Sequence, residues 1–379
     1  MSEPNRMRAS VELSWSGVRE ASTRLLGVLA LIVQLLVLVT PAAAQIQRLN
    51  LVLPTDNRAL LEGKPEDFFQ FIDRTVDGVA TTPWEGGQFG FVRDPRKLRT
   101  GETLYSRFHE GLDIKPVSRD ARGEPLDEVR SIAPGEVVHA MAESGKSNYG
   151  RYIVVKHDWG YGPFCSLYAH LREIKVTVGA KVEAGTVLGV LGYTGTGIDQ
   201  RRAHTHVELN VFLSSRFDAW HDGQFKTPNL NGLYNGMNLI GLDLSGLYLA
   251  LHKNPATSAA QAVTQTEAFY RVAVPGTAPM EILKTYPWLC HEALPPGAPA
   301  SWEITFSAWG LPVNVKPAAL KTSQATLVWV KASTMPYYYQ TRGCVAGSGD
   351  KPVLSAEGAG FVKLVSGDFP DVEKKSTKD

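Results

Sequence analysis

Histidines at short, even spacings are the residues of this chain best suited to chemistry, because an imidazole can bind a metal ion or transfer a proton near neutral pH. His204 and His206 lie in residues 203–211, where polar and apolar residues alternate. Such alternation is typical of a half-buried β-strand, on which side chains two residues apart point to the same face. The two imidazoles therefore stand side by side, either as part of a zinc site or as a chance surface pair.

Two further segments change the balance between these alternatives. Residues 108–114 carry His109 and Asp113 at another even spacing, so an extended chain turns both to one face. Imidazole nitrogen and carboxylate oxygen suit Zn²⁺, and three protein ligands with one open position are typical of a catalytic site. In residues 164–171, Tyr168 and His170 share a face opposite a buried side that includes a cysteine. The sequence thus predicts three strands that each present histidine on a polar face.

These and other motifs resemble one known family. Between the motifs of His109 and His204 lie residues 132–138 (IAPGEVV), 148–157 (NYGRYIVVKH), 178–189 (VGAKVEAGTVLG) and 192–195 (GYTG), which resemble motifs of the lysostaphin/LytM-type zinc metalloendopeptidases in the same order. The resemblance covers roughly residues 101–212. Enzymes of this family cut peptide bonds in bacterial peptidoglycan, so the resemblance implies that activity and an antiparallel β catalytic domain with a metal groove.

The resemblance also implies a ligand set. The zinc ligands of the family fall on His109, Asp113 and His206, which would hold one Zn²⁺ per chain. Zinc lowers the pKa of water from 15.7 to about 7 and can polarise the scissile carbonyl. Peptide cross-links of peptidoglycan are then the expected substrate.

The remaining histidine motifs imply catalytic roles. His170 and His204 match the pair beside the metal in the family. We expect His204 to act as general base and His170 to contact the transition state, although the two roles could be exchanged. Tyr168 could contact substrate or pack in the groove wall.

Two alternatives to a wall hydrolase remain open. The chain could be a non-catalytic relative that regulates other cell-wall hydrolases, but such a relative would be marked by a lost zinc ligand. It could also be a zinc peptidase for secreted proteins or peptides. Residues 115–126 and 196–203 are longer than the usual family turns and should flank the groove, which leaves the substrate open.

The N-terminal segment predicts export. Residues 25–39 are apolar and are followed by small residues, which indicates a signal peptide spanning residues 1–44 with cleavage after Ala44. We therefore expect a periplasmic or extracellular protein without stable membrane insertion, and a retained N-terminal anchor is the alternative. The formal net charge of +1 and the absence of a basic run argue against nucleic-acid binding. Nothing in the sequence predicts the oligomeric state.

The rest of the chain predicts a mainly β protein with a smaller C-terminal β domain, whose tryptophans suit either a packed core or stacking on sugars. We expect the following parts: an N-terminal extension over residues 45–100, the zinc peptidase domain over 101–256, a linker over 257–266, the small β domain over 267–365 and a disordered tail over 366–379.

Three cysteines in an exported chain allow one disulfide. Cys290 and Cys344 both lie in the predicted C-terminal domain and are the expected pair. Cys165 lies on the buried side of its strand and should remain a free thiol.

Overall fold

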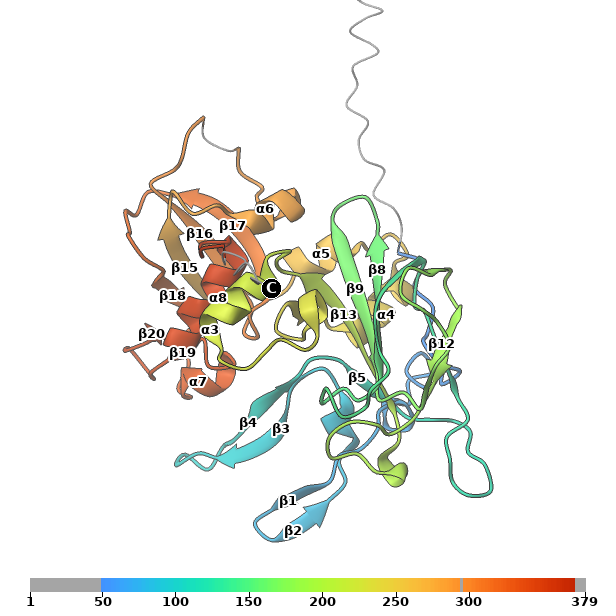
Figure 1. The fold of residues 1–379 in the computed structure, drawn as a ribbon. Coiled ribbons are helices and arrows are strands. Elements are labelled where there is room, and N and C mark those ends of the chain that lie inside the picture. The colour runs from blue at the N-terminus through green and yellow to red at the C-terminus, as the bar shows by residue number, and fades with distance from the viewer. Residues whose placement is uncertain (1–48, 294–295, 372–379) are drawn as a thin grey trace, which may run out of the picture. The chain divides into compact units, whose positions relative to one another are not determined.

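A computed structural model describes residues 49–293 and 296–371, and they are mainly β, with 31% strand and 19% helix (Figure 1). This confirms the predicted fold class. The predicted signal peptide and most of the predicted tail lie outside the described residues. Within them, no helix is both long enough and apolar enough to cross a membrane.

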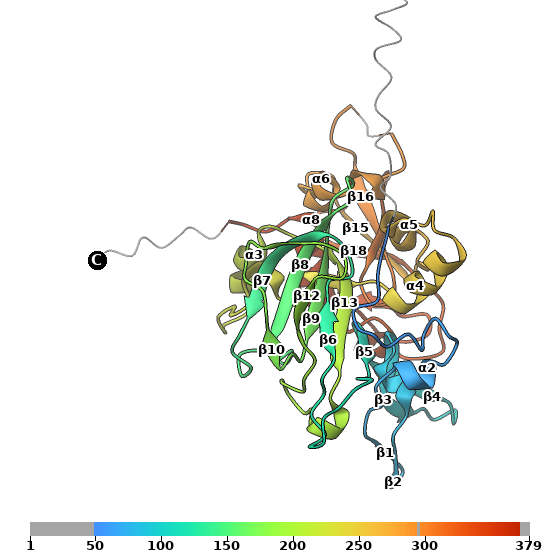
Figure 2. The same ribbon diagram turned by 90° about the vertical axis from the view of Figure 1, so that its right-hand side faces the viewer.

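The largest sheet has seven strands, and every pairing in it is antiparallel (Figure 2). The strands run in the order β11, β7, β8, β9, β13 and β14, and β5 pairs with the start of β13. Their bounds are β5 (Leu112–Ile114), β7 (Gly135–Met141), β8 (Tyr152–Asp158), β9 (Pro163–Ala169), β11 (Lys181–Val182), β13 (Thr205–Phe212) and β14 (Leu239–Gly241).

Strand β13 is the alternating segment singled out in the sequence. Its apolar residues Val207, Leu209 and Val211 belong to the main core, while Glu208 lies on the other face with His206. The prediction of a half-buried strand was wrong, because residues 205–211 are all buried. A second apolar cluster lies on the neighbouring strands β8 and β9, and a hydrogen-bonded network encloses the polar face.

Smaller sheets and hairpins surround this sheet. They are formed by β1 (Arg74–Val76) with β2 (Val79–Thr81), β3 (Gly90–Lys97) with β4 (Thr103–His109), β6 (Glu128–Arg130) with β12 (Val187–Val190) and β10 (Glu173–Ile174), and β19 (Val345–Ala346) with β20 (Val353–Leu354). In this hairpin, β3 lies in the predicted N-terminal extension, whereas β4 lies in the predicted peptidase domain and ends at His109.

A separate four-stranded sheet lies within the predicted C-terminal domain. Its strands run in the order β17 (Pro312–Ala318), β16 (Ser301–Phe306), β15 (Tyr270–Pro275) and β18 (Thr326–Val330). The main apolar core continues from this sheet into the seven-stranded sheet, and the described residues belong to one compact unit of the chain. Most of the partly buried tryptophans of this region contact that core. The predicted domain boundaries stay predictions.

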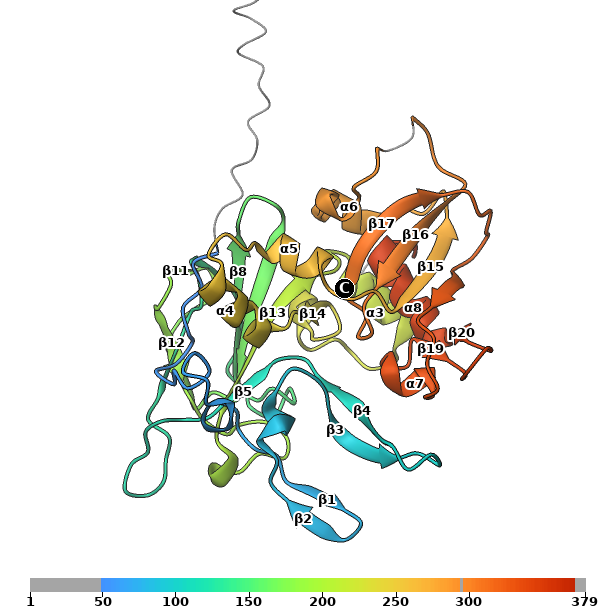
Figure 3. The ribbon, with the colours of Figure 1, turned by 180° about the vertical axis from the view of Figure 1, so that it is seen from behind.

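The helices are short and lie around the sheets (Figure 3). They are α2 (Pro65–Phe68), α3 (Phe217–Gln224), α4 (Leu244–Lys253), α5 (Ala259–Thr264), α6 (Glu281–Thr285), α7 (Tyr337–Gln340) and α8 (Ala356–Ser366), with 3-10 turns η1 (Trp84–Gly87), η2 (Gln200–Arg202), η3 (Gly232–Tyr234) and η4 (Pro287–Leu289). The predicted linker therefore contains a helix, α5, which begins with a capping box at Ser258.

The predicted Cys290–Cys344 disulfide is not formed, and all three cysteines are free. Cys290 is half-buried after η4, where its thiol donates to the carbonyl of Glu292 at 3.4 Å. Cys344 is buried, and burial raises the pKa of its thiol. The two thiols thus lie in different surroundings. Cys165 is buried on β9 as expected.

Trp309 joins the C-terminal sheet region to the hairpin that carries His109. Its ring stacks on Phe108 with centroids 5.5 Å apart and meets Phe89 edge-on at 5.3 Å. Its indole Nε1 donates to the carbonyl of Gly241 at 2.9 Å. One side chain therefore holds β4 and β14 together.

We expect Trp309→Ala to lower the free energy of unfolding by about 2 kcal/mol or more, because it removes both ring contacts and leaves a carbonyl without its donor. Chemical denaturation would measure this loss. Trp329→Ala is the control, since that ring carries a cation–π contact with Arg271 and should cost less than about 1 kcal/mol. Equal losses of unfolding free energy in the two variants would contradict the conclusion that Trp309 holds β4 and β14 together.

Candidate metal centre

Three potential metal donors converge where β4, β5 and β13 meet. His109 ends β4, Asp113 lies in β5, and the pairing of β5 with β13 sets Asp113 directly opposite His206. His109 Nε2 lies 3.0 Å from His206 Nδ1 and 3.0 Å from Asp113 Oδ1, and His206 Nδ1 lies 2.9 Å from the same oxygen. All three residues are buried. The structure thus brings together the three predicted ligands.

The route by which His109 and Asp113 meet differs from the expected one. We predicted a single extended segment, but β4 ends at His109 and β5 begins at Leu112. Gly111 lies in the turn between them, where a Cβ atom would be 2.5 Å from the carbonyl oxygen of Val207. Only glycine allows this close approach of the turn to β13.

The donor set fits zinc. Two imidazoles and one carboxylate are a ligand set typical of catalytic zinc sites, which leave one position open. Donors held at 2.0–2.2 Å by a tetrahedral ion are separated by about 3.3–3.6 Å, close to the separations found here. His109, Asp113 and His206 would therefore hold the ion after small side-chain movements.

Hydrogen bonds orient both imidazoles of this trio. His109 Nδ1 donates to the carbonyl of Gln88 at 2.7 Å, which leaves Nε2 to face the other donors. His206 Nε2 lies 2.8 Å from Glu208 Oε1, which leaves Nδ1 for the same purpose. Such second partners fix the tautomer of a metal-binding histidine and raise its basicity.

Glu208 belongs to a buried network of its own. Tyr149 donates its hydroxyl to Oε1 at 2.8 Å, and the Asn210 amide donates to Oε2 at 2.9 Å. Burial alone would raise the pKa of Glu208, yet the hydrogen bonds from His206, Tyr149 and Asn210 lower it. The carboxylate therefore stays charged beside His206. Tyr149 was not among our predicted site residues.

Charge also governs Asp113. Burial would raise the pKa of its carboxyl, but His109, His204 and Arg93 hold it well below the usual value. In His206, burial opposes protonation, while the hydrogen bonds to Asp113 and Glu208 raise its pKa to about 9. Asp113 therefore stays charged, and a cation that binds the trio must displace a proton from His206.

His170 and His204 lie beside the trio. His204 Nε2 is 3.3 Å from Asp113 Oδ1, and the His170 and His204 rings have centroids 4.8 Å apart. Each donates Nδ1–H to a backbone carbonyl, His170 to Thr194 at 2.8 Å and His204 to Arg202 at 2.6 Å. In both rings Nε2 is therefore left as a proton acceptor.

His170 departs from the predicted strand. β9 ends at Ala169, and His170 adopts a left-handed backbone conformation with φ of 62°. Burial and the nearby His204 and His206 hold its pKa well below the usual value, so its ring is neutral near pH 7. Its ring centroid lies 5.8 Å from that of His206.

Tyr168 does not contact this site, so its predicted role in substrate binding was wrong. Its side chain lies fully buried in the main core, on the face of the sheet opposite His206. Its hydroxyl accepts hydrogen bonds from the amide of Ile132 at 2.8 Å and from Ser166 Oγ at 2.9 Å. As strand alternation predicts, Tyr168 and Leu167 point to opposite faces of β9. Both faces are covered, so both side chains are buried.

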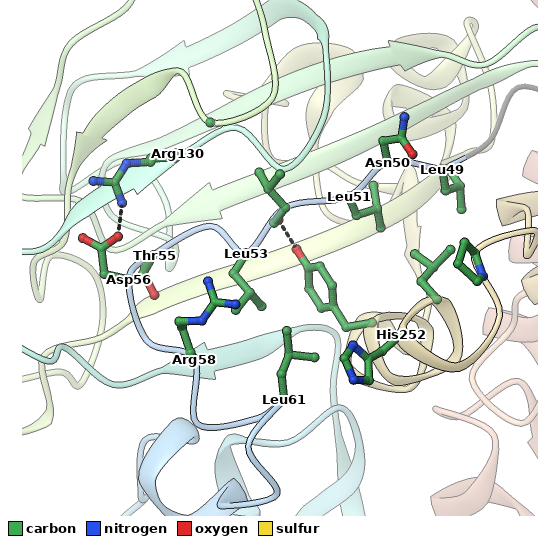
Figure 4. A pocket seen from close by; sticks show the side chains of 15 residues that line it. Leu49, Asn50, Leu51, Leu53, Thr55, Asp56, Arg58, Leu61, Arg130 and His252 are labelled. Atoms are coloured by element: carbon green, nitrogen blue, oxygen red, sulfur yellow. Dashed lines mark hydrogen bonds and ion pairs between the residues drawn. The ribbon is translucent and has the colours of Figure 1, made fainter.

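A surface cavity of about 620 Å³ lies between residues 49–61 and α4 (Figure 4). Its lining is largely apolar, with an ion pair between Asp56 and Arg130 at 2.9 Å at one edge. None of the five candidate-site residues lines it. The cavity therefore does not compete with the metal centre as a catalytic site.

Comparison with known proteins agrees with the resemblance seen in the sequence. Residues 107–218 match the model of Peptidase family M23. This segment contains all five candidate-site residues and spans less than a third of the chain.

Three solved structures are similar to this chain. The first is a mutant catalytic domain of the prophage-encoded M23 protein EnpA from Enterococcus faecalis, with 21% identity, coverage of 37% of this chain and 79% of that chain, and a TM-score of 0.23. The second is the catalytic domain of lysostaphin from Staphylococcus simulans, with 24% identity, coverage of 32% of this chain and 75% of that chain, and a TM-score of 0.23. The third is a zinc-containing peptidase from Vibrio cholerae, with 24% identity, coverage of 36% of this chain and 41% of that chain, and a TM-score of 0.21. These scores are low, so the likeness to Peptidase family M23 rests on the match over residues 107–218.

We expect the affinity for Zn²⁺ to rise about tenfold per pH unit between about pH 6 and pH 8. The pKa of His206 is about 9, so a cation that takes Nδ1 must displace one proton over this range. Competition with a chelator at several pH values would measure the slope. Glu208→Gln keeps a hydrogen-bond acceptor but removes the charge. The rise of zinc affinity with pH should therefore flatten toward about pH 8 in this variant. A wild-type affinity that does not change with pH would contradict the assignment.

Proposed function

Since residues 107–218 match the model of Peptidase family M23, we propose that the protein is a zinc-dependent endopeptidase that hydrolyses peptide cross-links of bacterial peptidoglycan. One observation carries the proposal. A buried His–Asp–His trio has its donor atoms directed at one another, and two further imidazoles lie beside it, each with Nδ1 hydrogen-bonded to a backbone carbonyl. The trio supplies the ligands, and the two other histidines supply acid–base groups.

Each histidine has a stated task in this proposal. A zinc ion held by the trio would supply Lewis-acid chemistry that makes water nucleophilic and polarises the scissile carbonyl. His204 Nε2 takes the proton of the attacking water and passes it to the leaving amine, since this atom lies 3.3 Å from Asp113 Oδ1. His170, whose ring centroid lies 4.8 Å from that of His204, is assigned the contact with the transition state. The backbone carbonyls of Thr194 and Arg202 keep both rings in the required tautomer.

The complete donor set favours catalysis over the non-catalytic alternative. A non-catalytic regulator of cell-wall hydrolases has no need of three oriented donors and two tautomer-fixed histidines. A zinc peptidase for secreted proteins or peptides would use the same trio, so the substrate must be decided by digestion. The insertions that flank the groove were our reason to keep that alternative.

Export is the second part of the proposal. The apolar stretch over residues 25–39 and the small residues before position 45 support a signal peptide and a periplasmic or extracellular location. Mass spectrometry of the protein from its native compartment would give its N-terminus. A chain that begins at Gln45 supports export with cleavage, whereas a retained N-terminus would favour the anchor.

We expect the purified mature protein to release peptide-bond cleavage products from isolated sacculi, and a chelator to abolish this activity until Zn²⁺ is added back. Mass spectrometry of the fragments would identify the scissile bond. Sacculi left intact while a protein or peptide substrate is cut would support the alternative peptidase, and no cleavage of any substrate would support the regulator.

We also expect His204→Ala and His170→Ala each to lower activity by about 10²-fold or more, while zinc content stays near one per chain. The trio is untouched in both variants, so metal analysis separates the two roles. His252→Ala is the control, because this exposed histidine lines the cavity of Figure 4 rather than the metal centre. Loss of zinc in His204→Ala would make that residue a ligand and contradict the assignment.

A further inference from the structure

Arg93 contacts the candidate metal centre from outside the segment that matches the M23 family. Its Nη2 forms an ion pair with Asp113 Oδ2 at 2.5 Å, whereas Oδ1 of the same carboxylate faces His109 and His206. The side chain of Asp113 is 4% exposed and that of Arg93 is 20% exposed. The two oxygens of one buried carboxylate therefore have separate partners.

A β-bulge places Arg93 on this side of its strand. Gly90 and Phe91 pair with His109 and Phe108, but the register then shifts and Arg93, instead of Val92, pairs with Arg107. Residues paired across antiparallel strands point to the same face, and strand alternation puts Arg107 on the face of His109. Without the extra residue, Arg93 would point to the face of Phe91. The bulge thus turns the guanidinium toward the metal centre, a use of bulges common near active sites.

A second hydrogen bond anchors the guanidinium. Arg93 Nε donates to the carbonyl of Gly86 at 2.9 Å, in the turn η1. A Cβ atom on the next residue, Gly87, would lie 2.3 Å from the carbonyl oxygen of Gln70, so this turn packs tightly on the backbone before it. Gln70 in turn donates its amide to the carbonyl of Asp113 at 2.8 Å. The turn that holds Arg93 is therefore fixed to the strand that carries Asp113.

The charge balance supports the same conclusion. Arg93 and Arg107 lie directly opposite each other, and like charges at such positions are unfavourable. Arg107 is exposed to water, whereas Arg93 is directed at a buried carboxylate. The pair with Asp113 compensates the charge of Arg93, and a charge-assisted hydrogen bond of this kind is among the strong ones.

We propose that Arg93 is a positioning residue for the metal centre. By holding Asp113 Oδ2, it keeps Oδ1 between His109 and His206, where this oxygen would help to hold the ion. This inference rests on the proposed zinc site and extends it to a residue of the N-terminal extension. The hairpin β3–β4 thus contributes to the site in two ways, since β4 ends at His109 and β3 carries Arg93.

The test compares zinc affinity in three variants by competition with a chelator. We expect Arg93→Met to weaken Zn²⁺ binding by about 10–100-fold, the usual effect of losing a partner behind a metal ligand. Arg93→Lys should fall between the wild type and Arg93→Met, because one amine can reach Asp113 but cannot also reproduce the fork that reaches Gly86. Arg107→Met is the matched control, since it removes the same charge from the opposite strand without contacting Asp113.

A spectroscopic measurement separates positioning from general stability. Bound to Co²⁺ in place of Zn²⁺, Arg93→Met should show an altered visible spectrum from changed coordination, while Arg107→Met should match the wild type. The melting temperature of each variant without metal reports any loss of folding. If Arg93→Met does not fold, Arg93→Lys decides by the same two measurements.

Two results would overturn the inference. Zinc affinity and cobalt spectra unchanged in the Arg93 variants would show that Asp113 needs no support. Tighter zinc binding in Arg93→Met than in the wild type would show that the arginine acts only by repelling the cation. A wild-type protein that binds no zinc would instead refute the proposed function, and the inference with it.

Discussion

The buried charge of Asp113 is the constraint on which the candidate site depends. Its side chain is 4% exposed, and a carboxylate so far from water is costly unless it is paired and hydrogen-bonded. His109, His204, His206 and Arg93 all have a nitrogen within 3.3 Å of its oxygens. These four partners come from β4, the segment before β13, β13 itself and β3. One charge therefore ties together segments that lie far apart in the chain.

The region predicted as a separate C-terminal domain takes part in holding this arrangement. Trp309 stacks on Phe108, the residue before His109, and Arg342 lies over the same ring. Arg342 also forms an ion pair with Glu110 at 2.8 Å, on the other side of His109. The C-terminal region thus contacts the residues on both sides of His109. Packing of the C-terminal region against β4 should therefore limit how far His109 can move.

Several features could be predicted because they depend on local patterns. The alternation over residues 203–211 identified β13 and the face shared by His206 and Glu208. The motifs around His109 and Asp113 identified the donors that meet in space. The role of Tyr168 could not be predicted in this way, because alternation tells which residues share a face but not what covers that face. The Cys290–Cys344 pairing failed for a related reason, since shared membership of a region does not bring two thiols together.

The sequence by itself determined the donor types, the face shared by His206 and Glu208, and the mainly β class, because these follow from side-chain chemistry and from the two-residue period of a strand. Only the tertiary structure decided which oxygen of Asp113 faces the histidines and which one Arg93 holds. That choice depends on one extra residue in β3, Val92, which reverses the face of Arg93. No local pattern reveals such a bulge, because it exists only relative to the partner strand, and pairing between strands is a property of the folded chain.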